Sequence, residues 1–269
     1  MTVIQAIIIA IVEGLTEFLP VSSTAHMLFT NPLIGVQTSP FTELYEVVIQ
    51  LAAILSVVVV FWRKFLDFKH YSFYIKLIIA LVPAVIFGLL LKKHIDAALN
   101  NLVFIACVMI GGGILLLFID SFFKRCVIDE EKNISYKKSF IIGSFQVLSI
   151  VLPGFSRSAA TIIGGLSQKL TRRLAAEFSF FIAVPTMFAA SVKQVYDVHK
   201  HNPEVLKSGN MSLLAIGGLV SFVVALITVR FFINYVKNHT FRAFGVYRII
   251  LGLVVLALIY KGIIHQPTA

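Results

Sequence analysis

The chain has 269 residues, of which 58% are hydrophobic and 13% are charged, with a mean hydropathy of +0.93 and a formal net charge of +10. Because an average soluble domain has about 25% charged residues, this composition excludes a soluble globular protein. It predicts an all-α, multi-pass integral membrane protein with one membrane domain, 1–269. In so apolar a chain, excess Lys and Arg mark cytoplasmic loops, so no nucleic-acid partner is expected.

The first predicted element covers residues 3–30, and Leu19-Pro20 interrupts it after an apolar run of barely half a bilayer. Proline lacks a backbone N–H and disfavours helix at the residue before it, so we expect a helix, a sharp break and a second helix. Such a break is tolerated at membrane depth only where it lines a cavity or is buried in protein. This stretch is therefore predicted to be a re-entrant hairpin.

Three apolar crossings follow, then a charged loop, a second broken stretch and three more crossings. The second broken stretch, 139–168, is interrupted by Leu152-Pro153 and predicts a second re-entrant hairpin. The six crossings are expected at about 46–62, 74–91, 102–119, 174–192, 212–233 and 244–261.

The two broken stretches resemble each other. An offset of 133 positions places Glu13 on Gln146 and Pro20 on Pro153 without a gap, which indicates an internal duplication. The repeat halves are about 1–119 and 139–261, joined by a charged cytoplasmic loop, 120–138. Because each half holds three crossings, the second copy is inverted, as in transporters whose sites lie between repeats. The two breaks should then meet inside the membrane.

Basic residues gather in the connections near 63–73, 120–138, 168–173 and 230–243. These connections share one side of the membrane if each hairpin returns to the side from which it entered. By the positive-inside rule this side is cytoplasmic. Both termini and the mouth of the first hairpin are then expected on the outer side.

Glu13 and Glu17 are four residues apart and lie on one face of the first half-helix. Two carboxylates in a low-dielectric site cannot both stay ionised cheaply, so one holds a proton or a cation lies between them. The alternative is a pair of carboxylates solvated at a helix end.

Ser22, Ser23 and Thr24 follow the first break and are residue types that cap helices. A helix that begins there directs free N–H groups and its positive dipole end into the break, which suits an anion. Capping alone is the simpler interpretation. His26 lies on the same helical face as Ser23 and is either a packed core histidine or a nucleophile, base or acid.

At the second break, Gly154 permits a tight backbone and Ser156 and Ser158 can cap the next helix. Arg157 places a permanent cation at membrane depth, so it needs an anionic partner. That partner is a substrate phosphate, or Glu13 and Glu17 in a structural ion pair. Together the two breaks have the residues that phosphoryl transfer needs.

These two stretches, "EGLTEFLPVSSTAHM" (13–27) and "LPGFSRSAATI" (152–162), resemble the bacterial undecaprenyl-diphosphate phosphatase family associated with bacitracin resistance. The stretches 41–62, 175–185 and 244–252 also resemble this family, so the similarity covers nearly the whole chain. The positions that match the family motifs are Glu13, Glu17, Ser22, Ser23, Thr24, His26, Pro153, Gly154, Ser156, Arg157, Ser158 and Thr161.

The resemblance implies an enzyme of the bacterial cytoplasmic (inner) membrane that removes the terminal phosphate of undecaprenyl diphosphate. The site would open to the periplasmic, outer side, and a divalent cation, Mg²⁺ or Ca²⁺, would assist. The product, undecaprenyl phosphate, is the lipid carrier reused for peptidoglycan synthesis. The resemblance leaves open whether the chain forms a homodimer.

For this family we expect Arg157 to grip the phosphate and Glu13 and Glu17 to bind the cation or hold a proton. Two nucleophiles are considered: Ser23, with Glu17 or His26 as base, and His26 itself. The phosphate cradle is expected to comprise Ser22, Thr24, Gly154, Ser156, Ser158 and Thr161.

A competing hypothesis is a polyprenyl-phosphate flippase or secondary transporter, since inverted repeats with broken helices build many transporters. The combination of Arg157 with hydroxyls and carboxylates favours catalysis, because passage of a lipid does not need it.

Overall fold

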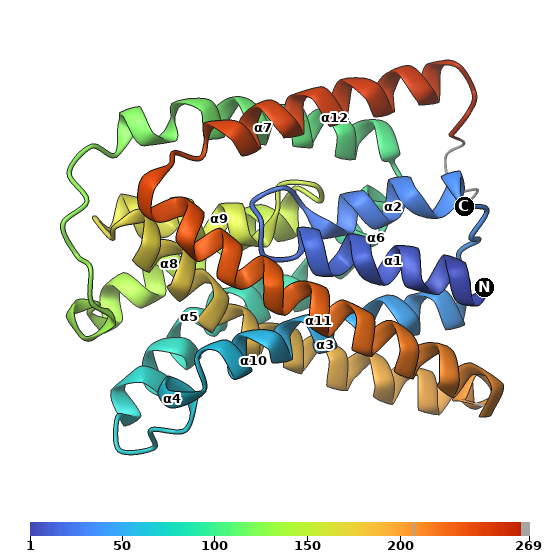
Figure 1. Ribbon diagram of the computed structural model, residues 1–269, viewed down its shortest axis with the longest axis horizontal. Helices are drawn as coiled ribbons and strands as arrows, with labels where there is room; N and C mark the ends of the chain where they lie inside the picture. Colours follow the sequence, from blue (N-terminus) through green and yellow to red (C-terminus); the bar gives the residue numbers. More distant parts are fainter. Residues whose placement is uncertain (207, 265–269) are drawn as a thin grey trace.

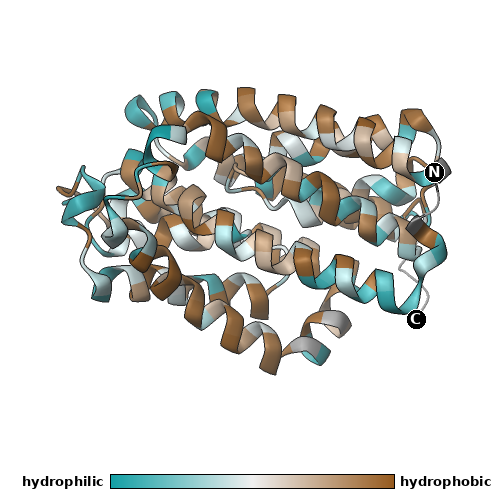
Figure 2. Cartoon of the chain, turned by 90° about the horizontal axis from the view of Figure 1, so that it is seen from below, coloured by the Kyte–Doolittle hydropathy of each residue, from teal (hydrophilic) through white to brown (hydrophobic). Residues whose placement is uncertain are grey.

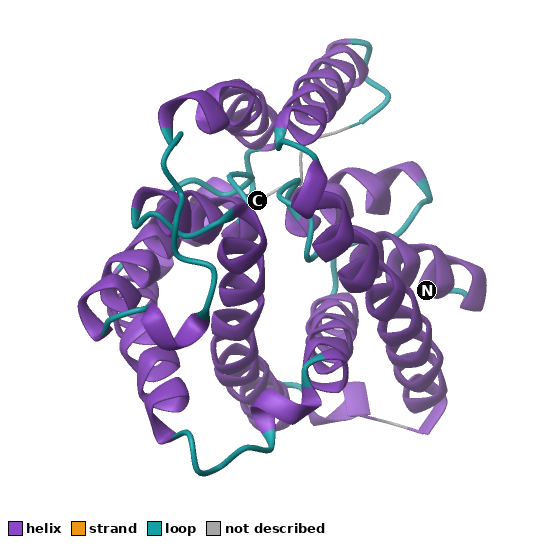
Figure 3. Cartoon of the chain, turned by 60° about the vertical axis from the view of Figure 1, so that its left-hand side comes forward, coloured by secondary structure: helices purple, strands orange, loops and turns teal. Residues whose placement is uncertain are grey.

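The computed structural model describes residues 1–206 and 208–264. Most of these residues are helical (Figure 3), and within them the only β feature is an isolated bridge between Ile128 and Leu170. The described α-helices are α1 (Val3–Thr16), α2 (Ser23–Leu33), α3 (Pro40–Val60), α4 (Trp62–Phe65), α5 (Tyr71–Leu90), α6 (Lys92–Leu99), α7 (Leu102–Phe122), α8 (Tyr136–Val151), α9 (Arg157–Ser167), α10 (Arg172–His201), α11 (Ser208–Asn238) and α12 (Arg242–Tyr260).

Six of these helices, α3, α5, α7, α10, α11 and α12, are long and apolar enough to cross a membrane. They confirm the predicted all-α, multi-pass membrane protein. Their outer faces carry large exposed apolar side chains, such as Leu90 (73% exposed) and Ile227 (63%), which suit lipid contact. Helix α10 runs to His201, past the predicted end at 192, because polar residues continue the helix beyond the apolar run that hydropathy detects.

The long helices run along one axis of the molecule (Figure 1). The four connections rich in Lys and Arg lie together at one end, whereas α1 begins and α12 ends at the other. Hydropathy colouring shows polar segments gathered at the ends, most densely at the end with these connections (Figure 2). This arrangement agrees with the relative placement of loops and termini expected from the sequence.

Both predicted breaks are present. Helix α1 is followed by a turn and α2, and α8 by a turn and α9, and each pair returns to the end of the bundle at which it began (Figure 1). Re-entry into the bilayer stays a prediction.

The helix contacts have a two-fold pattern. In the predicted repeat, α1, α3, α5 and α7 of the first half correspond to α8, α10, α11 and α12 of the second. The contact of α1 with α11 is therefore matched by the contact of α8 with α5. Corresponding helices also pack against each other, α3 against α10 and α7 against α12. The pattern supports the duplication, which stays a prediction.

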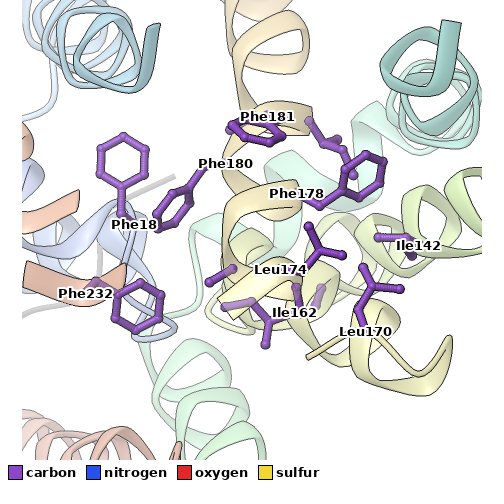
Figure 4. Packing of buried hydrophobic residues seen from close by; sticks show 14 of the residues in the cluster. Phe18, Ile142, Ile162, Leu170, Leu174, Phe178, Phe180, Phe181 and Phe232 are labelled. Carbon is purple, nitrogen blue, oxygen red and sulfur yellow. The ribbon is translucent and has the colours of Figure 1, made fainter. Parts of the chain in front are cut away.

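An aromatic core holds the first break in place. Phe18, in the turn after α1, packs edge-on against Phe180 of α10 with ring centroids 5.0 Å apart, and Phe180 lies 5.8 Å from Phe232 of α11 (Figure 4). All three side chains are fully buried. Such close packing fixes the turn between two membrane-spanning helices.

Candidate active site

Each break ends at a serine that caps the next helix from a left-handed backbone conformation. Ser22 (φ 73°) accepts a hydrogen bond from the Ala25 N–H, and Ser156 (φ 79°) accepts one from the Ala159 N–H. A positive φ costs a non-glycine residue about 1–2 kcal/mol, which the cap helps to offset. Both half-helices therefore begin at the break, with N-terminal N–H groups directed into it.

The positions of the two cap residues show that the two breaks differ in length by one residue. Ser22 and Ser156 are 134 positions apart, whereas Pro20 and Pro153 are 133 apart. The second break has one more residue between proline and cap, so Arg157 corresponds in the structure to Ser23 and not to Thr24.

The two breaks meet, as expected. Arg157 Nη2 lies 2.8 Å from Glu17 Oε1, and Ser158 Oγ donates a hydrogen bond of 2.9 Å to the Phe18 carbonyl. The Arg157 and Glu17 side chains are 13% and 6% exposed. Of the anionic partners considered for Arg157, the structure shows Glu17.

Glu17 also contacts Ser23. Ser23 Oγ donates a hydrogen bond of 2.5 Å to Glu17 Oε2, while the other carboxylate oxygen binds Arg157. A carboxylate oriented by a guanidinium in this way can accept the serine proton.

The two ring nitrogens of His26 contact groups other than Ser23. Its Nδ1 lies 2.7 Å from the Ser22 carbonyl oxygen and its Nε2 lies 2.7 Å from the Tyr247 hydroxyl, and the His26 and Tyr247 rings are stacked with centroids 5.6 Å apart. A carbonyl only accepts, so Nδ1 carries a proton, and in the neutral imidazole Nε2 accepts from Tyr247. Both ring nitrogens are engaged.

Glu13 is fully buried, and within the described residues neither of its carboxyl oxygens has a hydrogen-bond partner. It lies on α1, one turn before Glu17, which caps the end of this helix. A buried carboxyl group without a donor needs a proton or a cation.

The carboxylate pair fits a divalent cation. Among the described residues no cluster of three or more His, Cys, Asp or Glu side chains forms a complete metal cage. Mg²⁺ in phosphoryl-transfer sites commonly takes one or two carboxylates and completes its shell with water and substrate phosphate. Glu13, whose oxygens accept from no donor among the described residues, is the carboxylate that suits such a cation, with Glu17 one turn away; the cation itself stays a prediction.

A small polar cavity of about 80 Å³ lies at the junction of the two breaks. It is lined by Glu17, Ser22, Ser23, Thr24, Gln50, Ser156, Arg157, Ser158 and Met187. Most of the predicted site residues therefore gather at one cavity.

Glu13, His26, Gly154 and Thr161 are outside its lining. Thr161 Oγ1 donates to the Arg157 carbonyl and lies 2.6 Å from Ser179 Oγ, and the Ser179 carbonyl accepts from Arg157 Nη1. Thr161 thus supports Arg157.

Gly154 has a φ of 95°, and a Cβ there would lie 2.8 Å from the Ile105 carbonyl oxygen. Its side-chain-free backbone is what allows the second break to form.

The sequence interpretation missed Arg248 on α12, whose side chain is fully buried. Its guanidinium donates to the carbonyls of Pro20 (3.1 Å) in the first break and Phe155 (2.7 Å) and Gly154 (2.9 Å) in the second. Arg248 therefore clamps the two breaks together. A signal was present, because an arginine in an apolar crossing is a functional candidate.

Gln50 and Tyr247 were also missed. A polar Gln50 in an apolar crossing was a weak signal, whereas Tyr247 was marked only by lying in the stretch 244–252, which resembles the family.

Known proteins resemble this chain along almost its full length. The family description "Bacitracin resistance protein BacA" matches residues 6–254. A protein of Flavobacterium psychrophilum named undecaprenyl-diphosphatase is 48% identical and covers 95% of each chain. Proteins of the same name from Porphyromonas gingivalis (43% identical; 98% of this chain, 99% of the relative) and Aquifex aeolicus (40%; 94% and 97%) are also similar. The chain belongs to the BacA family of bacitracin resistance proteins.

Proposed function

We propose that this protein hydrolyses undecaprenyl diphosphate to undecaprenyl phosphate and inorganic phosphate, the activity for which its relatives are named. The observation that carries the proposal is the contact of Glu17 with both Ser23 and Arg157 at a polar cavity. This arrangement unites a nucleophile, a base and a permanent cation, which phosphoryl transfer requires.

In the proposed mechanism, Ser23 Oγ attacks the terminal phosphorus while Glu17 takes its proton. The bond from phosphorus to the bridging oxygen breaks, and undecaprenyl phosphate leaves with the electron pair. The departing undecaprenyl phosphate takes that proton from Glu17, which is then ionised again. Glu17 next takes a proton from a water whose oxygen attacks the phosphoserine, the bond from phosphorus to Ser23 Oγ breaks, and the proton passes from Glu17 to Ser23 Oγ as inorganic phosphate leaves. Arg157 and the N–H groups at the start of α2 and α9 stabilise charge on the phosphoryl oxygens.

Glu13 and Glu17 would hold the divalent cation, Mg²⁺ or Ca²⁺. When bound, the cation neutralises diphosphate charge and favours departure of the leaving phosphate.

Ser23 is preferred to His26 as nucleophile because its oxygen contacts the base directly, whereas both His26 nitrogens are engaged elsewhere. For the same reason Glu17 is preferred to His26 as the base.

The test is phosphate release from undecaprenyl diphosphate by purified full-length protein in detergent. Ser23→Ala and Arg157→Ala should each lower kcat by at least about a thousandfold. Ser139→Ala, a matched control that changes a buried serine on α8 outside the lining of the cavity, should stay within about threefold of wild type.

Phosphate release by Ser23→Ala at nearly the wild-type rate would refute the role of Ser23 as nucleophile. A rate for Arg157→Ala equal to that of wild type would overturn the assignment of the active site. Since detergent leaves no membrane to cross, absence of release from the wild-type protein would favour the flippase or transporter instead.

We further propose that the protein lies in the cytoplasmic membrane with the basic end in the cytoplasm, so that the termini and the opening of the site are outside. Single cysteines at Ser39 and Lys137, in a chain with Cys107→Ser and Cys126→Ser, test this orientation. An impermeant thiol reagent applied to intact spheroplasts should label Ser39→Cys and spare Lys137→Cys; the opposite result would invert the topology.

A further inference from the structure

A charged cavity lies at the basic end of the bundle and shares no lining residue with the candidate active site. It measures about 600 Å³ and lies where α7 and α11 end and α10 begins, within the size range of ligand pockets. Four cations line it, Lys124, Arg172, Arg173 and Lys237, together with two carboxylates, Asp120 and Asp129.

Both aspartates are engaged in holding the arginines. Asp120 accepts from Arg172 Nε and, through its other oxygen, from the Phe241 N–H. Asp129 accepts from Thr171 Oγ1 and from Arg173 Nη2, and these hydrogen bonds lower its pKa. The carboxylates thus fix two guanidinium groups at the cavity and leave further N–H donors on each.

The two lysines are not neutralised. Lys237 Nζ donates to the neutral Asn234 side chain, and Lys124 has no carboxylate partner among the described residues. Just outside the lining, the mostly buried carboxylate of Glu177 lies 3.5 Å from Arg173 Nη1 and also interacts electrostatically with Lys237. Four cations against three carboxylates still leave a net positive charge, and a cleft with one sign of charge concentrates counter-ions.

A second cavity of about 300 Å³ adjoins the first and shares Phe123, Lys124 and Leu166 with it. It adds Arg125 and Lys169, and no acidic residue lines it. It also adds the ring of Phe122, which is 67% exposed at the end of α7. Cationic and exposed apolar groups therefore lie side by side at the end of an apolar crossing.

We propose that this pair of cavities is a second binding site, for a phosphate-bearing anionic group, and that its ligand is the headgroup of an anionic phospholipid. Arginine and lysine together recognise phosphate oxygens. Basic pockets between membrane-spanning helices on the cytoplasmic side are suited to lipid headgroups. Phe122 offers the apolar contact that an acyl chain needs and a free phosphate does not.

The experiment measures Tm of the full-length protein in neutral detergent against added ligand. The probes are dioctanoyl phosphatidylglycerol, dioctanoyl phosphatidylcholine and inorganic phosphate. The test variant is Lys124→Gln/Lys237→Gln. The matched control is Lys137→Gln/Lys138→Gln, which removes two charges from the start of α8, outside both cavities.

Phosphatidylglycerol should raise the Tm of wild type and control, and the test variant should need about 25-fold more of it, since each lysine near an anionic group contributes about fivefold. Phosphatidylcholine should have no effect. A response to inorganic phosphate at equal affinity would support the phosphate site with free phosphate as its source. Equal half-saturating concentrations in the test and control variants would overturn the proposal.

This site is independent of the proposed catalysis. Phosphate release by Lys124→Gln/Lys237→Gln should stay within about twofold of wild type at saturating substrate, because neither lysine lines the catalytic cavity.

Discussion

The Tyr247 hydroxyl lies 2.7 Å from His26 Nε2, although 221 residues separate them in the chain. Tyr247→Phe keeps the ring that stacks on His26 and frees the nitrogen. If Ser23 is the nucleophile, kcat for phosphate release should fall only about two- to tenfold, the equivalent of one neutral hydrogen bond of about 0.5–1.5 kcal/mol.

Tyr260→Phe, at an exposed position at the end of α12, is the control and should match wild type. A loss of a thousandfold or more in Tyr247→Phe would place His26 in the chemical step.

The ion pair between Glu17 and Arg157 should be strongly coupled because both side chains are mostly buried. Removing one partner leaves the other charge unpaired, so Glu17→Ala and Arg157→Ala should each lower the free energy of unfolding by about 3–5 kcal/mol. The double variant should lose clearly less than the sum of the two, as measured by unfolding in mixed micelles.

The pair of Asp129 and Arg173, which is more exposed, provides a comparison cycle with an expected coupling of about 0–1 kcal/mol. Additive losses for Glu17 and Arg157 would show that the ion pair does not join the breaks.

Arg248→Met should destabilise the protein by at least about 3 kcal/mol, because the buried carbonyls of Pro20, Gly154 and Phe155 lose their donor. Thermal unfolding in detergent measures the effect, and Arg242→Met, exposed on the same helix, should be nearly neutral. Wild-type stability and activity in Arg248→Met would mean that the other contacts suffice to join the breaks.

Gly154→Ala tests the backbone of the second break. A φ of 95° and the Ile105 carbonyl 2.8 Å from the added Cβ should together cost about 2–4 kcal/mol of unfolding free energy. Gly111→Ala is the matched control: no atom lies within 4 Å of its Cβ position and it sits within α7, so it should stabilise by up to about 1 kcal/mol. Equal stability of the two variants would contradict the observed backbone.

Mg²⁺ or Ca²⁺ should raise the Tm of the wild-type protein, since a ligand that binds only the folded state stabilises it. Glu13→Gln should abolish that rise, because it removes a carboxylate that no donor satisfies. Glu43→Gln, an exposed carboxylate at the start of α3, should preserve it. An undiminished rise in Glu13→Gln would exclude Glu13 as a ligand.

The sequence was most informative where polar residues interrupt apolar runs. Pro20 and Pro153 predicted both breaks, and Arg157 required an anionic partner, for which the structure shows Glu17 while the substrate phosphate stays a prediction. Sequence alone could not choose between Glu13 and Glu17, since both lie on one helical face and only packing decides which reaches the second break. The extra residue between Pro153 and Ser156 could not be predicted either. The Leu-Pro pairs of the two breaks align in the sequence, but the position of each cap residue depends on the geometry of the turn.

Arg248 was detectable as an arginine in an apolar crossing, but its role was not, because its partners are backbone carbonyls, which carry no sequence signature. Tyr247 is one of several tyrosines, and only the fold brings it to His26.

The position of Arg248 on the last membrane-spanning helix also bears on biosynthesis. The residues of both breaks are synthesised long before α12 leaves the ribosome. Arg248, which joins the two breaks, is not available until α12 has inserted. A nascent chain that stops before α12 therefore contains every residue proposed for the chemistry and still lacks the part that holds them together. We therefore expect catalytic competence only after α12 has inserted, and truncated products should not act on the lipid carrier.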